Sequence, residues 1–265
     1  VYMMVSMVLG IIIYMFIMMF GGMVMSSVIE EKSSRVVEVL ISSVKATELM
    51  FGKIIGIALV ALTQFMLWIV LTVGIIGVVS AVAGPAFLSG VDTTEMVGLS
   101  GMDAEQISAM AEPSEFSVIV DTLSNMHLGE ILVSFIIYFI LGYMLYASMF
   151  AAIGSAVENE GDSSQLQLPV TIPVLIGFFI ALYAFKAPDS ALVFWGSMIP
   201  FTSPIVMLAR LPFGVPMWEL VLSIVLLAGT FVACAWLSAK IYKVGILMFG
   251  KKTTWKDLWK WIKQK

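Results

Sequence analysis

Long apolar runs alternate with polar segments along the 265-residue chain. Five of these runs reach the length of about 20 residues that a helix needs to cross a bilayer. They cover about 2–28, 54–83, 131–157, 169–187 and 217–241. Hydrophobic residues make up 60% of the chain and charged residues 12%, which excludes an ordinary soluble globular domain. The pattern predicts an all-α integral membrane protein, a polytopic bundle with five transmembrane helices.

The segment 29–53, which lies between the first two runs, is highly charged. Its charged residues are Glu30, Glu31, Lys32, Arg35, Glu38, Lys45, Glu48 and Lys53. Each would cost about 2.5–3.5 kcal/mol at the centre of a bilayer, so the segment lies in water or at a membrane surface. Arg35, Glu38 and Lys45 fall on one stripe at helical spacing. The opposite stripe is apolar and consists of Val36, Val37, Leu40, Ile41 and Val44. This pattern predicts an amphipathic helix along the interface.

The remaining polar segments differ in charge and length. The loop 84–128 contains acidic residues but no lysine or arginine. The stretch 188–216 contains two apolar pieces of about ten residues, too short to cross, which predicts a re-entrant or surface-lying helical hairpin. The tail 250–265 is basic with apolar residues at helical spacing, which predicts an amphipathic interfacial helix. We expect Pro169 and Pro173 in the first turns of the fourth span, where a missing N–H does least harm.

Lysine and arginine are concentrated on one side of the predicted spans. The segment 29–53 and the tail from Lys240 onward contain twelve of the fourteen basic residues, and five alternating spans place both on the same side. Positively charged segments stay in the cytosol. We therefore expect 29–53, the acidic turn 158–162 and the tail to be cytosolic. The loop 84–128 and the hairpin 188–216 are expected to face outward.

Two polar segments resemble those of a known family. The first contains Glu30-Glu31-Lys32, Arg35, Glu38-Val39-Leu40, Glu48-Leu49 and Gly52-Lys53. The second contains Glu158-Asn159-Glu160 followed by Ser164-Gln165-Leu166-Gln167-Leu168-Pro169. Together they resemble the two cytosolic segments of ABC-2 type exporter permeases, and more narrowly the branch that includes the sodium-extrusion permeases. The chain departs from the pattern at Ala46, where a proline is expected to break the helix.

This resemblance implies a site and a set of partners. The segment 29–53 would be a coupling segment that docks on a separate ABC ATPase subunit. The docking residues would be Glu30, Glu31, Lys32, Arg35 and Glu38, with Glu158 and Glu160 as a secondary contact. The chain would pair with a second permease subunit in the inner (plasma) membrane and move substrate out of the cytoplasm. It would not itself be an enzyme, and nucleic acid is not an expected partner. An earlier span and an external region would precede Val1.

The chain contains one near match to a nucleotide-binding motif. Gly245–Lys252 nearly spells a P-loop, but Lys252 replaces the serine or threonine that binds magnesium, and no strand precedes the segment. The lone His127 cannot form a multi-histidine metal site. We therefore expect no cofactor or metal on this chain. ATP and magnesium are expected on the partner subunit.

Polar residues are sparse within the predicted spans. Because polar groups in hydrocarbon tend to face the protein interior, Gln64, Tyr138 and Tyr146 are candidates for a translocation seam. The simpler interpretation is that each makes an interhelical hydrogen bond. No acidic residue lies near the middle of a span, which argues against a self-contained proton- or sodium-driven carrier.

Three interpretations of the whole chain remain open. An exporter permease needs the coupling segment and an ATPase encoded elsewhere. A non-transporting membrane anchor or immunity-type protein needs neither, and its charged loops would only fix topology. A secondary carrier needs intramembrane charges and an inverted repeat, and the sequence shows neither. The exporter permease agrees best with the resemblance.

Overall fold

The computed structural model describes residues 2–89, 128–249 and 254–263. Most of the predicted acidic loop, with His127, lies outside these residues. The chain divides into two compact units. One contains Leu62–Gly129, and the other contains Tyr2–Ala61 and Glu130–Lys265. We call the second the core unit.

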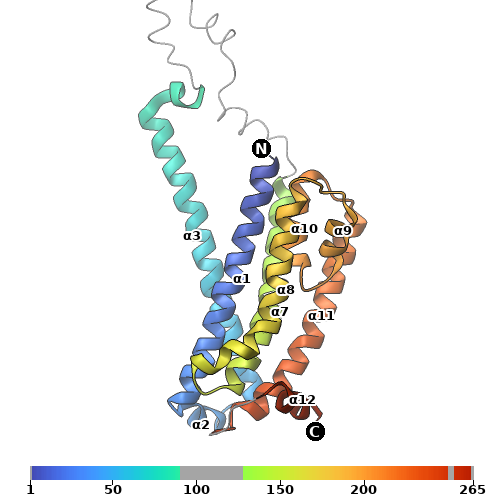
Figure 1. Cartoon of the computed structure of the whole chain (residues 1–265). Coiled ribbons are helices and arrows are strands. Elements are labelled where there is room, and N and C mark those ends of the chain that lie inside the picture. The colour runs from blue at the N-terminus through green and yellow to red at the C-terminus, as the bar shows by residue number, and fades with distance from the viewer. Residues whose placement is uncertain (1, 90–127, 250–253, 264–265) are drawn as a thin grey trace, which may run out of the picture. The chain divides into compact units, whose positions relative to one another are not determined.

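The described residues form helices and contain no strand, which confirms the predicted fold class. Among the described residues, five helices are long and apolar enough to cross a membrane. The long helices are α1 (Tyr2–Ser33), α3 (Ala46–Ser89), α7 (Leu128–Ala156), α8 (Glu160–Ala184) and α11 (Met217–Gly245). The shorter elements are α2 (Val36–Ile41), α9 (Ala191–Met198), α10 (Ser203–Arg210), the 3-10 helix η1 (Leu211–Phe213) and α12 (Trp255–Lys263). In the core unit, α2 and α12 lie at one end, and α1 begins at the other (Figure 1).

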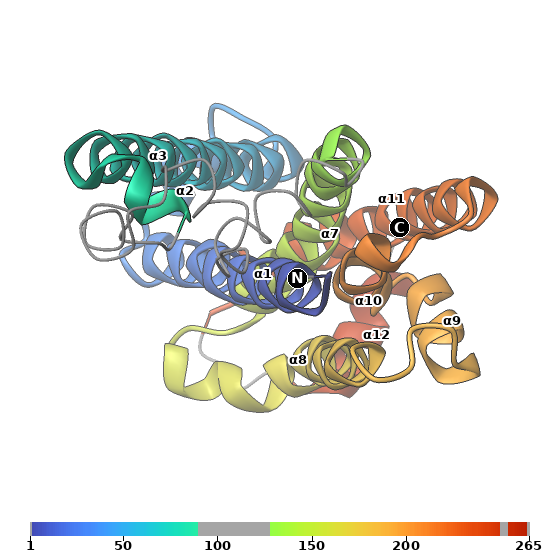
Figure 2. The ribbon, with the colours of Figure 1, turned by 90° about the horizontal axis from the view of Figure 1, so that it is seen from above.

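The short helix α10 lies at the centre of the core unit. All eight of its residues are buried. It contacts α1, α8, α9 and α11, and Figure 2 shows it between these helices and α7. Gly142 of α7 allows a close approach, because a Cβ there would lie 2.8 Å from the Cβ of Pro204. The two apolar pieces predicted as a hairpin are thus helices, α9 and α10. The burial of α10 agrees with the re-entrant form of the prediction rather than the surface-lying form.

The segment 29–53 does not form the continuous amphipathic helix that its periodicity predicts. Instead α1 extends to Ser33, a turn follows, and α2 is six residues long. The hydroxyl of Ser33 donates to the carbonyl of Glu30 at 3.0 Å. Such local bonds compete with regular helix geometry and favour an end here. Of the predicted apolar stripe, Val37 is fully buried, whereas Val36 and Val44 are exposed.

The prediction for the two prolines of the fourth span was also wrong. α8 begins at Glu160, so Pro169 and Pro173 lie inside the helix. The preceding polar residues are helical because acidic side chains near a helix N-terminus are favoured by the helix dipole. Asp162 lies in this first turn. The helix therefore begins well before its apolar part.

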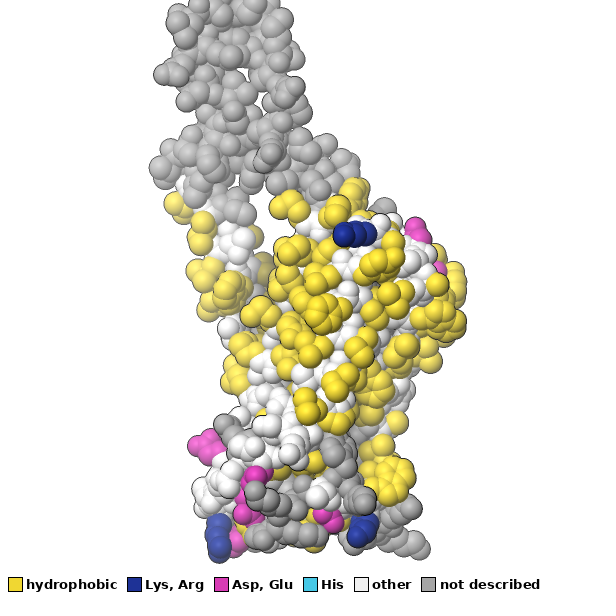
Figure 3. Space-filling model, viewed as in Figure 1, with side chains coloured by type: hydrophobic (Ala, Val, Ile, Leu, Met, Phe, Trp, Pro, Cys, Tyr) yellow, Lys and Arg dark blue, Asp and Glu magenta, His cyan; other side chains and the backbone are white. Residues whose placement is uncertain are grey.

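The described part of the other unit continues α3 from Leu62 to Ser89. Between residues 62 and 78, the side chains whose burial is described are mostly exposed and apolar, and Trp68 and Val70 are examples. In the core unit, Figure 3 shows a broad hydrophobic surface between two ends where charged side chains gather. A wide apolar band of this kind suits contact with lipid, because a soluble protein rarely exposes so large an apolar patch.

Candidate functional site

The site forms where α1 ends and the chain turns into α2. Arg35 occupies this turn with φ 57°, and it is the non-glycine residue with positive φ among those described. A left-handed conformation costs an ordinary residue about 1–2 kcal/mol. Strained backbone of this kind persists only where the surroundings hold it, and it is common at functional sites. The turn is therefore a constrained feature of the predicted coupling segment.

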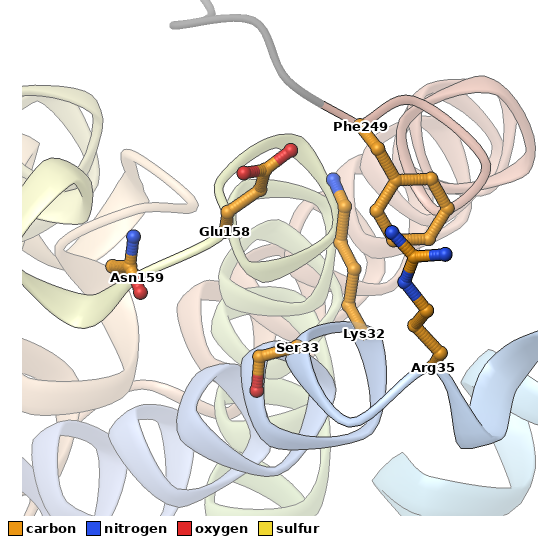
Figure 4. Close-up of a pocket in the computed structure, with 6 residues that line it drawn as sticks. All are labelled: Lys32, Ser33, Arg35, Glu158, Asn159 and Phe249. Carbon is orange, nitrogen blue, oxygen red and sulfur yellow. The ribbon is translucent and has the colours of Figure 1, made fainter.

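A pocket of about 480 Å³ lies beside this turn. It is lined by Lys32, Ser33, Arg35, Glu158, Asn159 and Phe249 (Figure 4). The two segments that the sequence marks as family-like therefore meet at one place, although more than a hundred residues separate them. The guanidinium of Arg35 lies 5.7 Å from the centre of the Phe249 ring. The pocket thus combines two cations, one carboxylate and one aromatic face.

Two of the predicted docking residues turn inward. Lys32 is 1% exposed, and its ammonium donates to the carbonyl of Ser155 at 2.5 Å and to that of Gly245 at 2.8 Å. Glu31 forms an ion pair with Lys53 of α3 at 2.7 Å. These side chains hold helices of the core unit together.

The other predicted docking residues are accessible. Glu30, Arg35 and Glu38 are exposed on the segment, and Glu158 is half-buried in the turn between α7 and α8. Glu160 begins α8, and its side chain lies outside the described residues. The accessible residues can therefore contact a partner directly. Lys32 is buried in the bundle, and the partly exposed Glu31 is paired with Lys53. The docking role of all these residues stays a prediction.

The predicted seam residues are divided between the two units. In the core unit Tyr138 and Tyr146 are fully buried. The hydroxyl of Tyr138 donates to the carbonyl of Leu220 at 3.4 Å, and that of Tyr146 donates to the carbonyl of Phe201. The Tyr138 bond joins α7 to α11, as the simpler interpretation expects, whereas the Tyr146 bond joins α7 to the turn between α9 and α10. Gln64 belongs to the Leu62–Gly129 unit and is exposed there. The seam stays a prediction.

One charged cluster was missed by the sequence reasoning. Arg210, at the end of α10, forms an ion pair with Glu219 in the first turn of α11 at 2.5 Å. Both are buried, with exposures of 6% and 7%. Arg210 also donates to the hydroxyl of Ser197, whose carbonyl accepts from Ser223. The available signal was a pair of opposite charges on either side of Pro212 and Pro216 in an otherwise apolar region.

Taken with its long apolar helices, this architecture defines a polytopic helical membrane protein. Comparison with known families identifies the family within this class. Residues 3–240 match the family described as ABC-2 family transporter protein, and the chain belongs to that family. The family supplies the membrane components of ABC transporters and is not itself catalytic.

Two relatives match nearly the whole chain. It is 32% identical over 248 residues to "Uncharacterized protein YhaP" of Bacillus subtilis (strain 168), covering 93% of this chain and 52% of the relative. It is 28% identical over 255 residues to "Uncharacterized protein MJ1024" of Methanocaldococcus jannaschii, covering 96% of this chain and 52% of the relative. The chain thus spans about half the length of both relatives. No solved structure matches it significantly.

Proposed function

We propose that this chain is the membrane-spanning permease part of an ATP-driven exporter whose ATPase is a separate polypeptide. Membership of the ABC-2 family supports the transporter class. The proposal goes beyond family membership in three respects. Transport is directed out of the cytoplasm, the ATPase is a separate polypeptide, and the segment 29–53 is the contact between the permease and the ATPase.

The observation that carries the proposal is the meeting of Arg35 and Glu158 at one pocket. Arg35 comes from the first family-like segment and Glu158 from the second. A partner that touches this pocket would engage both segments at once. Glu38, in the first turn of α2 that follows Arg35, is also exposed. We call Arg35, Glu38 and Glu158 the docking face.

In this mechanism two permease subunits pair in the inner membrane, with the segment 29–53, the turn 158–162 and the tail in the cytosol. ATP binding draws two ATPase subunits together. The docking face follows that movement and passes it to the membrane helices. ATP and magnesium are held by the ATPase, so their chemistry takes place outside this chain.

The orientation has its own test. A cysteine introduced at the exposed Ser34, in a Cys234→Ser background, should resist an impermeant thiol reagent added to intact cells. It should react once the cells are opened. Rapid labelling of intact cells would invert the layout and remove the docking face from the cytosol.

The substrate proposal rests on the resemblance to the sodium-extrusion permeases, which makes sodium the first candidate. Vesicles containing the permease and a co-purified ATPase should accumulate sodium when ATP is supplied outside. A sodium flux that does not respond to ATP would exclude this substrate. Parallel assays with a peptide, a lipid and a drug would then identify the class, with substrate-stimulated ATP hydrolysis as the readout.

A further inference from the structure

Three helices of the core unit end around the ammonium of Lys32. Lys32 lies in the last turn of α1, Ser155 lies in the last turn of α7, and Gly245 is the last residue of α11. One ammonium donates to the carbonyls of both Ser155 and Gly245. Figure 4 shows its side chain rising from α1 between Glu158 and Phe249.

Helix ends explain why a lysine suits this place. The last four carbonyls of an α-helix lack partners within the helix. They also carry the negative end of the helix dipole, equivalent to about half an elementary charge. A buried ammonium needs compensating hydrogen bonds. Lys32 obtains them only while the ends of α7 and α11 both remain beside the end of α1.

Two glycines bring the same three helices into close contact. A Cβ on Gly245 would lie 2.8 Å from the hydroxyl oxygen and 3.0 Å from the carbonyl oxygen of Ser155, so α11 meets α7 with no room for a side chain on Gly245. A Cβ on Gly154 would lie 2.8 Å from the carbonyl oxygen of Met25, so α7 meets α1 in the same way. Close-packed contacts of this kind transmit displacement with little slack.

The same helix end is continuous with the docking face. Lys32 precedes Arg35 by three residues, and the backbone N–H of Arg35 donates to the carbonyl of Lys32 at 3.1 Å. Glu31 adds a second link, because Lys53 of α3 bonds both to Glu31 and to the carbonyl of Ser27. A displacement of the Arg35 turn therefore acts first on residues that hold other helices.

We propose that Lys32 is a positioning residue that transmits movement of the docking face to α7 and α11. This inference rests on the proposed function, because the movement begins with a docked ATPase. Lys32 then takes no direct part in docking. Its two hydrogen bonds make the ends of α1, α7 and α11 move together, so that a displacement at the surface reaches two membrane helices.

The bonds themselves are tested without any ATPase. In Lys32→Met, amide hydrogen exchange at the last turns of α7 and α11 should accelerate by about tenfold. This factor corresponds to the stabilisation that is lost when a hydrogen bond to a charged group is removed. Lys45→Met is the matched control, because it removes an exposed lysine of the same segment. Unchanged exchange at both helix ends in Lys32→Met would overturn the inference.

Transmission is tested in the complex with a co-purified ATPase. Spin labels at the exposed positions Gln165 of α8 and Lys243 of α11, in a Cys234→Ser background, report the distance between these helices. The parent should change this distance when a non-hydrolysable ATP analogue binds. Lys32→Met should bind the ATPase normally but lose the change, and Lys32→Arg should recover part of it. A full change in Lys32→Met would overturn the inference.

Gly245→Ala covers the case in which Lys32→Met fails to fold. It keeps Lys32 but pushes α11 away from Ser155, and it should also lose the distance change while retaining ATPase binding. Gly229→Ala is the control, since a Cβ there meets nothing within 4 Å. A full change in Gly245→Ala would count against transmission through this contact. Failure of the parent to bind any ATPase would instead refute the proposed function.

Discussion

The two ends of α11 are held by different kinds of charge. At its first turn the carboxylate of Glu219 meets the guanidinium of Arg210, a buried pair of full opposite charges. At its last residue the carbonyl of Gly245 accepts from Lys32, so a full charge meets the partial charge of a helix end. The first arrangement neutralises itself and fixes α10 to α11. The second depends on three helices staying together, which makes it the end better suited to rearrangement.

The largest predicted loss of stability comes from breaking the Arg210–Glu219 ion pair at the first turn of α11. Arg210→Met should lower the free energy of unfolding by about 3–5 kcal/mol, because it leaves Glu219 as an uncompensated buried charge. The double variant Arg210→Met/Glu219→Gln should lose much less, since it removes both charges. Unfolding in detergent micelles measures both. Equal losses in the single and double variants would show that Glu219 is not buried as a charge.

Substitution at the Lys32 end of α11 should lower the free energy of unfolding less than substitution at the Arg210 end. Lys32→Met removes hydrogen bonds to a charged group, and we expect a loss of about 2–3 kcal/mol. The groups that lose this donor are backbone carbonyls rather than a charged side chain, and the carbonyl of Gly245 keeps a bond from the backbone N–H of Met248 at 3.1 Å. The same unfolding measurement ranks the two ends directly. A loss greater than that of Arg210→Met would reverse the comparison.

A neutral bond beside the central helix should matter less than either charge. Tyr146→Phe removes the donor to the carbonyl of Phe201, and we expect a loss of about 1 kcal/mol. Tyr183→Phe is the matched control, because Tyr183 is exposed. If Tyr146 also lines a translocation seam, its variant will alter substrate-stimulated hydrolysis more than stability. Equal behaviour of the two variants would remove Tyr146 from both roles.

The smallest effect is expected at the exposed surface of the segment 29–53. Lys45 and Glu48 form an ion pair at 3.8 Å with largely exposed side chains. Exposed pairs contribute about 0–1 kcal/mol, so Lys45→Met should barely change stability. A loss of stability comparable to that of Lys32→Met would mean that the difference in exposure does not determine how much each lysine contributes to stability.

The sequence predicted the helical class, the long apolar helices and the two short helices before α11, because these depend on apolar run length and on prolines. It could not predict that α1 continues to Ser33, since the charges at Glu30–Lys32 indicated a separate surface helix. Lys32 is buried there because two helix ends supply acceptors, and those acceptors are backbone atoms without a side-chain signal. The close contact at Gly245 was missed because it depends on Ser155 of α7, which is distant in the sequence.

The sequence predicted which residues belong to the candidate site, but not which of them are exposed and which are buried between helices. Charge pattern and resemblance together selected Glu30–Glu38 and the acidic turn, and the structure brings Arg35 and Glu158 to one pocket. Periodicity placed Arg35 and Glu38 on one helical stripe. The left-handed turn at Arg35 breaks that stripe, so their relation depends on a local backbone conformation that no residue type there demands.

Whether the segment 29–53 binds the ATPase is tested by capture of the co-purified ATPase on a permease with a charge-reversed docking face. Arg35→Glu/Glu38→Arg keeps the net charge of the segment and changes only exposed side chains, so the permease should remain folded. We expect ATPase capture to fall by about tenfold or more, as the loss of close charge pairs at an interface implies. Lys45→Glu should capture the ATPase as the parent does. Undiminished capture of the ATPase by the double variant would contradict the claim that this segment connects the permease to the ATPase.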